Sequence, residues 1–81
     1  MFAEIATVVE QYLENAVSLA ELRDWQASHT TALLATTDKA AERLDAGLLS
    51  GFALLDDNAL TPEEFRQDLH AALLEARSLA A

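Results

Sequence analysis

Apolar residues recur every three to four positions along most of the chain, the spacing of one face of an α-helix. Four such segments are separated by short polar turns and predict four helices. The first covers about residues 2–14, and the second starts at a cap at Ser18 and ends between His29 and Thr36. The third follows possible caps at 36–38 and ends near Asp56, and the fourth runs from a cap at Thr61 to about Leu79. The expected apolar faces contain Phe2, Ile5, Val9, Tyr12 and Leu13; Leu22, Trp25, His29, Ala32 and Leu33; Ala41, Leu44, Leu48, Phe52 and Leu55, widened by Leu49 and Ala53; and Phe65, Leu69, Ala72, Leu73, Ala76 and Leu79.

The same turn sequence precedes the second and the fourth predicted helix, at residues 15–23 and 58–66. In each copy an Asn can end one helix in a left-handed conformation, and the Ser18 or Thr61 side chain can cap the next. A Glu three residues after the cap can complete a capping box. Because short connections make consecutive helices antiparallel neighbours, we expect an all-α fold. The predicted architecture is an antiparallel four-helix bundle built from two helical hairpins, or two stacked hairpins, in a single helical domain over 1–81.

The length and the composition limit what such a fold can be. A chain of 81 residues buries only about 60% of its unfolded surface, so its core is thin and a homodimer is expected. It has no Cys, which excludes disulfides and thiolate sites. No apolar run approaches the roughly 20 residues that span a bilayer. The first residues lack a basic region before an apolar core, so no signal peptide is expected and the predicted location is cytoplasmic.

The chain is strongly acidic, with a net charge of −9 from 14 acidic and 5 basic residues. Such a charge repels nucleic-acid backbones and anionic membranes, so neither direct nucleic-acid binding nor membrane binding is expected. Either the acidity keeps the protein soluble, or the partner is a protein with a basic surface. The acidic pairs Asp56-Asp57 and Glu63-Glu64 flank the second joint. They either favour a helix N-terminus and a solvated corner or form an acidic docking patch.

The sequence contains no catalytic motif. A glycine-rich phosphate loop, a nucleophile elbow and a zinc-binding HExxH pattern are all absent. His29 and His70 lack a carboxylate three or four residues away on their own helices, so no helical metal site is expected. We therefore expect a protein that is not an enzyme, with no catalytic residues, no cofactor and no metal.

The candidate partner-binding residues come from uncharged or irregular positions. Two stretches, 27–37 and 46–55, carry no acidic or basic residue, which indicates burial in the bundle or contact with another chain. Gln26 and His29 are polar residues on an apolar face, and Trp25 suits either a core or an interface. Gly47 and Gly51 indicate close approach of a neighbouring helix, or a bend. The predicted partner-binding set is Trp25, Gln26, His29, Leu33, Leu34, Leu49, Phe52, Asp56 and Asp57.

The helix starts Ser-Leu-Ala-Glu-Leu at 18–22 and Thr-Pro-Glu-Glu-Phe at 61–65 resemble those of small bacterial immunity proteins of the colicin D type. These starts are common capping sequences, so the resemblance implies no function and no site residue. The expected function is a small acidic, non-catalytic protein–protein interaction module, such as an inhibitor, immunity or regulatory protein. The alternatives are a structural homo-oligomer and a nucleic-acid mimic that blocks the basic groove of a nucleic-acid-binding protein.

Overall fold

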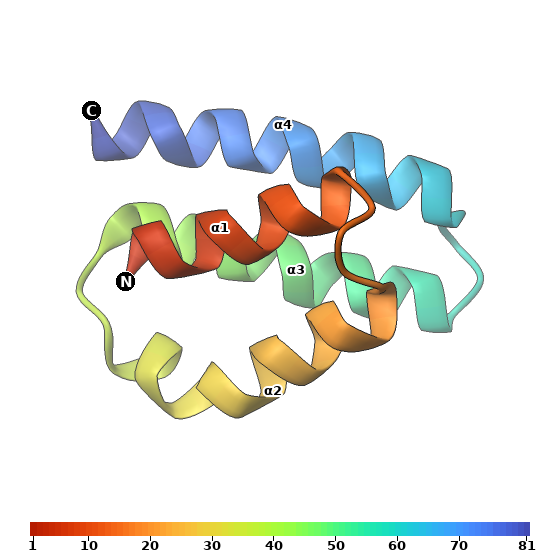
Figure 1. Cartoon of the computed structure of the whole chain (residues 1–81), viewed down its shortest axis with the longest axis horizontal. Coiled ribbons are helices and arrows are strands. Elements are labelled where there is room, and N and C mark those ends of the chain that lie inside the picture. Colours follow the sequence, from red (N-terminus) through yellow and green to blue (C-terminus); the bar gives the residue numbers. More distant parts are fainter.

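The computed structural model describes residues 1–81 and contains four α-helices and no strand. They are α1 (Phe2–Leu13), α2 (Leu19–Ala35), α3 (Lys39–Asp56) and α4 (Pro62–Ala80). Consecutive helices run antiparallel, and α2 and α4 lie on opposite sides of the layer formed by α1 and α3 (Figure 1). The predicted all-α bundle built from two helical hairpins is confirmed.

Two of the three connections have the same local structure, as the repeated turn sequence predicts. Asn15 and Asn58 adopt the left-handed conformation, with φ of 64° and 57°. After α1, the Ala16 N–H donates to the Gln11 carbonyl at 2.7 Å; after α3, the Ala59 N–H donates to the Leu54 carbonyl at 2.9 Å. Both are the long hydrogen bond of a Schellman motif, which satisfies carbonyls left free at a helix end.

The capping boxes that follow these turns are also present. The Ser18 hydroxyl accepts from the Glu21 N–H, and the Glu21 carboxylate accepts from the Ser18 N–H at 3.0 Å. Thr61 and Glu64 make the same pair of bonds before α4. The hydrogen bond from the Thr61 N–H lowers the pKa of the Glu64 carboxyl below its ordinary value.

The connection between α2 and α3 is different, because a single Asp caps α3 and also contacts α1. The Asp38 carboxylate accepts from the N–H groups of Ala40 and Ala41 in the first turn of α3. Its other oxygen accepts from the Phe2 N–H at 3.0 Å. The Phe2 bond, followed by the bond from Ala41, lowers the pKa of Asp38. This side chain therefore ties the start of α1 to the start of α3.

The core lies around α3, which contacts each of the other three helices. Its buried side chains include Leu44 and Leu48, both fully inaccessible. From the other helices, the largest fully buried side chains are Ile5, Val9, Leu22, Phe65, Leu69 and Leu73. In the uncharged stretch 46–55, the central position of α3 buries Leu48, Gly51 and Phe52, while the other side of the helix is exposed.

Four expected core positions are wrong, one of which is Ala32, exposed on α2. Leu49 and Ala53 do not widen the buried stripe of α3, since both are exposed. They lie on the side of α3 turned away from Leu44, where no helix covers them. Leu79 is 57% exposed, because the last turn of α4 extends beyond the start of α1 (Figure 1).

The two glycines are explained by the packing of α3 against α4. A Cβ at Gly51 would overlap the Phe65 ring of α4, and a Cβ at Gly47 would lie 3.1 Å from the Ala72 Cβ. The predicted close approach of a neighbouring helix is therefore confirmed. It makes α3 and α4 the pair with the most extensive contact in the molecule.

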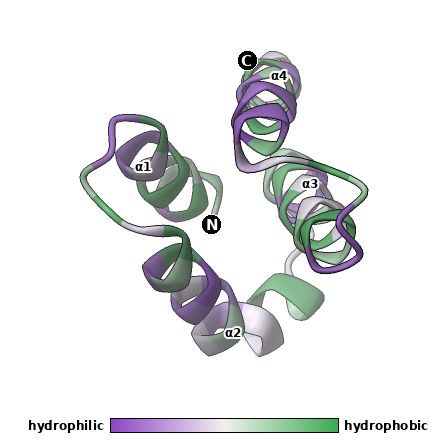
Figure 2. Ribbon diagram, turned by 90° about the vertical axis from the view of Figure 1, so that its right-hand side faces the viewer, coloured by the Kyte–Doolittle hydropathy of each residue, from purple (hydrophilic) through white to green (hydrophobic).

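Helix α2 is the least integrated element. Its buried residues are Leu22, Gln26 and Leu33, and none of its Cα atoms lies within 8 Å of one in α4. Figure 2 shows α2 at the far side of the bundle from α4, below the level of α1. The helix passes through Thr30 without fraying, although a threonine there is a weak helix former.

Candidate functional site

The polar residues predicted on the apolar face of α2 are all satisfied within the chain. Gln26 is only 7% exposed, and its Nε2 donates to the buried Asp45 carboxylate of α3 at 3.1 Å. The His29 ring stacks on the Trp25 ring with centroids 4.0 Å apart, and its Nδ1 lies 2.7 Å from the Trp25 carbonyl oxygen. Both rings are half-buried. Gln26 therefore joins α2 to α3, and only the Trp25–His29 pair reaches the surface.

The four predicted apolar partner residues divide into two groups. Leu33 and Phe52 are buried, and the Phe52 ring packs at 5.7 Å from the Phe65 ring. Leu34 is 80% exposed and Leu49 is 48% exposed. Of these four residues, only Leu34 and Leu49 can be reached by another protein without unpacking the core.

The two predicted acids at the end of α3 also differ from each other. Asp56 pairs with Arg23 of α2, with Oδ1 and Nη2 2.8 Å apart. The same guanidinium lies 4.7 Å from the centre of the Phe52 ring. Asp57 is exposed and makes no ion pair. Asp56 therefore attaches α2 to α3, while Asp57 remains free to pair with another molecule.

Every basic side chain of the protein is engaged within the chain. Arg43 pairs with Glu75 at 2.7 Å, Arg77 with Glu10 at 3.0 Å and Lys39 with Glu42 at 3.4 Å. Arg66 donates to the Leu13 carbonyl at the end of α1 at 2.6 Å and covers the Tyr12 ring. With Arg23 on Asp56, all 5 basic residues are accounted for.

Several exposed acids, in contrast, have neither an ion pair nor a hydrogen bond. They are Glu14, Asp24, Asp57, Glu63 and Asp68. Asp57, Glu63 and Asp68 belong to the α3–α4 hairpin, at the end of α3 and in the first two turns of α4. Four of the five basic side chains are paired with an acid, and Arg66 binds a carbonyl instead, so most of the unpaired charge of the surface is acidic and much of it is on this hairpin.

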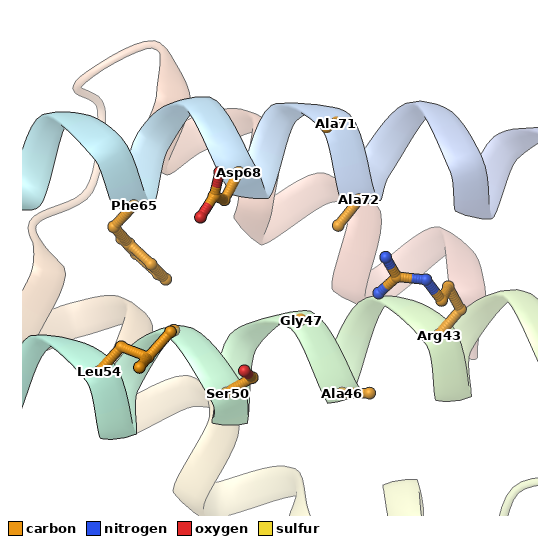
Figure 3. Close-up of a pocket in the computed structure, with 10 residues that line it drawn as sticks. Arg43, Ala46, Gly47, Ser50, Leu54, Phe65, Asp68, Ala71 and Ala72 are labelled. Carbon is orange, nitrogen blue, oxygen red and sulfur yellow. The ribbon is translucent and has the colours of Figure 1, made fainter. Parts of the chain in front are cut away.

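A shallow groove of about 510 Å³ runs between α3 and α4. Figure 3 shows Phe65 and Asp68 pointing from α4 towards α3, and Arg43 on the opposite wall towards the other end. The middle of the groove is lined by small side chains. Half of the lining residues are hydrophobic; the full set is Arg43, Ala46, Gly47, Ser50, Gly51, Leu54, Phe65, Asp68, Ala71 and Ala72.

Most of this groove was not predicted from the sequence. Gly47 and Gly51 were expected to be packing residues and were not connected with Asp68 across the helix pair or with Leu54 along α3. The signal was present: small residues recur at 46–47 and 50–51 and again at 71–72. None of the predicted partner residues lines the groove.

No group of three or more His, Asp or Glu side chains is arranged to bind a metal ion. His70 is exposed on α4, and the His29 ring is stacked on the Trp25 ring with its Nδ1 at the Trp25 carbonyl oxygen. No helix is long and apolar enough to cross a membrane.

Comparison with protein-family models, with curated proteins and with solved structures finds no match for this chain.

Proposed function

We propose that this protein is a non-catalytic interaction module that binds a partner with a basic surface, in the manner of an inhibitor, immunity or regulatory protein. The observation that supports it is which charged side chains already have a partner within the chain. All 5 basic side chains are engaged within the chain, whereas exposed acids such as Asp57, Glu63 and Asp68 are not. A partner that forms ion pairs with these free acids would contribute the positive side.

This charge distribution acts mainly on the rate of association. Complementary charges steer two proteins together, and salt screens them over a Debye length of about 10 Å at 0.1 M. The on-rate is expected to fall steeply as salt rises, while the off-rate changes less. Asp57 and Glu63 are the best candidates to dominate this effect, because neither has an internal partner and both flank the same joint.

The test is capture of partners on the immobilised chain from a lysate of its native host, followed by mass spectrometry. The expected result is a basic protein that is retained at about 0.05 M salt and lost at about 0.5 M. The on-rate of the purified partner is then measured at both salt concentrations. Binding that is equally fast in both would contradict the proposal.

Two double variants with the same change in charge provide the control. Asp57→Asn/Glu63→Gln removes the free acids next to the α3–α4 joint, and Glu14→Gln/Asp24→Asn removes free acids at α1 and α2. All four positions are exposed, so neither variant is expected to change stability by more than about 0.5 kcal/mol. Only the first is expected to slow association several-fold.

Self-association is the second candidate. It is favoured by large exposed apolar side chains on three different helices: Leu34 on α2, Leu49 on α3, and Leu74 and Leu79 on α4. Sedimentation at increasing concentration tests it, and Leu49→Asp is expected to weaken association more than it unfolds the chain. A single 8.8 kDa species at high concentration would exclude the homodimer.

A further inference from the structure

The α3–α4 groove has the length of a short helix. Arg43 and Leu54 line its wall on α3, and they are eleven positions apart along the helix, which corresponds to about 16.5 Å at 1.5 Å per residue. An apposed helix of about three turns would fit along it. The small side chains of Ala46, Ser50 and Ala71 in the middle allow such a helix to approach closely.

The two charged residues of the groove are not equivalent. The Arg43 guanidinium is already bound by Glu75, with Nε and Oε2 2.7 Å apart. Asp68 is exposed, makes no ion pair or hydrogen bond, and points into the space between the helices (Figure 3). The groove therefore presents one unneutralised charge, and it is negative.

The apolar part of the groove lies beside this charge. Leu54 on α3 is 39% exposed, and the edge of the buried Phe65 ring forms part of the wall between it and Asp68. An occupant that pairs with Asp68 would thus place apolar side chains against Leu54 and along the small residues. This combination describes an amphipathic helix with a basic residue at the edge of its apolar face.

A second copy of the chain does not suit this groove. Each copy carries a net charge of −9, and all of its basic side chains are engaged internally. A second copy could bring a basic side chain to Asp68 only by breaking one of these internal contacts, and it would add like-charge repulsion. A different protein with an unpaired basic side chain therefore suits the groove better.

We infer that the groove between α3 and α4 is the docking site for an amphipathic helix of another protein, and that a Lys or Arg of this helix pairs with Asp68. This inference rests on the proposed function, since it names the site and the kind of segment through which a basic partner would bind. It assigns the specific contact to Asp68, whereas Asp57 and Glu63 act on the rate of encounter.

The experiment uses a synthetic helical peptide of about three turns with leucines one turn apart and a lysine at the edge of the leucine face. A control peptide has glutamate in place of the lysine. Binding to the isotope-labelled chain is followed by the chemical shifts of its amides. The expected result is binding of the lysine peptide only, with the largest shifts at Ala46, Ser50 and Ala71.

Two pairs of variants locate the binding. Asp68→Asn is expected to weaken binding of the lysine peptide about two- to fivefold, the usual worth of an exposed ion pair, while Asp24→Asn on α2 leaves it unchanged. Ser50→Trp fills the groove from an exposed position and is expected to weaken binding at least tenfold. Thr31→Trp, at an exposed position of α2, is its control.

The inference is overturned if the lysine peptide does not bind at millimolar concentration, if the shifts fall outside the groove, or if Ser50→Trp binds normally. It is also overturned if the wild-type chain forms a dimer that Ser50→Trp abolishes, because a second copy would then occupy the groove. The proposed function fails separately, when capture of a basic partner does not depend on salt or on Asp57 and Glu63.

Discussion

The two helical hairpins begin from the same turn and end in different packing. Between α1 and α2, and again between α3 and α4, the chain leaves one helix through a left-handed Asn and enters the next through a capping box. Yet α3 and α4 have the most extensive contact in the molecule, whereas α1 and α2 touch over a much smaller part of their length. The turn sets the direction of the returning helix, and the residues along the helices determine how closely it packs.

The residues responsible for this difference are small ones. Both glycines of the chain are on α3, where their missing Cβ atoms leave room for Phe65 and Ala72 of α4. Helix α2 has no glycine and is attached to α3 by longer polar side chains, through Gln26 on Asp45 and Arg23 on Asp56. Close packing in one hairpin and polar attachment of α2 predict different responses to mutation.

The largest effect is expected from core truncations in the two regions. Phe65→Ala removes a ring that packs on Tyr12, Phe52 and Gly51, and should cost about 3–5 kcal/mol of unfolding free energy. Leu33→Ala should cost less, about 2–3 kcal/mol, because it removes fewer buried atoms and lies on α2, the least integrated helix. Urea unfolding measures both. Equal costs would mean that α2 is as firmly packed as the α3–α4 hairpin.

The polar attachment of α2 is tested by Gln26→Ala. It leaves the Asp45 carboxylate buried without its hydrogen bond, which should cost about 1–3 kcal/mol. Replacing both partners, as in Gln26→Leu/Asp45→Leu, should recover part of this loss, because no buried polar group is then left unpaired. If the double variant loses as much stability as the two single changes added together, the two side chains are not coupled.

The close packing of α3 on α4 is tested by adding one methyl group. Gly51→Ala should destabilise by about 1–2 kcal/mol, because the overlap with Phe65 outweighs the better helix propensity of Ala. Gly47→Ala is the matched control and should be close to neutral, since a Cβ there would make a close contact with Ala72 without overlapping it. Stabilisation by Gly51→Ala, measured by thermal unfolding, would show that the helices can separate at no cost.

The shared turn predicts equal effects in both hairpins. Ser18→Ala and Thr61→Ala each remove the side-chain half of a capping box and should each cost about 1 kcal/mol. Chemical denaturation of the two single variants and of the double variant checks this. A much larger cost for one of them would show that the two joints are alike in geometry but not in energy.

The stability contributed by the connection between α2 and α3 should decrease in acid. The bonds to Asp38 lower its pKa in the folded chain below the ordinary value of 3.8. The ionised Asp38 carboxylate therefore stabilises the fold fully above about pH 5, and this stabilisation is lost as the pH falls through the folded-state pKa. Glu64 contributes in the same direction. Unfolding measured at about pH 6 and about pH 3 should show a smaller loss in Asp38→Asn than in the wild type.

The local structure was predictable because it depends on residues close together in the sequence. Asn15 and Asn58, the caps Ser18 and Thr61, and the Glu residues three positions later determine their own turns. The apolar spacing likewise identified Leu44, Leu48 and Phe65 as core. These features need no knowledge of which helix lies next to which.

The parts that were missed depend on contacts between helices. Gln26 was an anomaly in the sequence because its partner Asp45 is on another helix. Leu79 has the correct spacing for the core, but the bundle ends before it. The groove could not be predicted from the sequence for the same reason, because its two walls are formed by residues 43–54 of α3 and 65–72 of α4.

The absence of contact between α2 and α4 has a consequence for local unfolding. Helix α2 can leave the surface of α1 and α3 by breaking its own contacts, centred on Leu22, Gln26 and Leu33, without disturbing the α3–α4 hairpin. Amide hydrogens of α2 should then exchange with solvent through a partial opening, and those of α3 and α4 only through opening of the whole molecule. The protein would in this sense have two levels of stability, with the hairpin that carries the groove at the higher level.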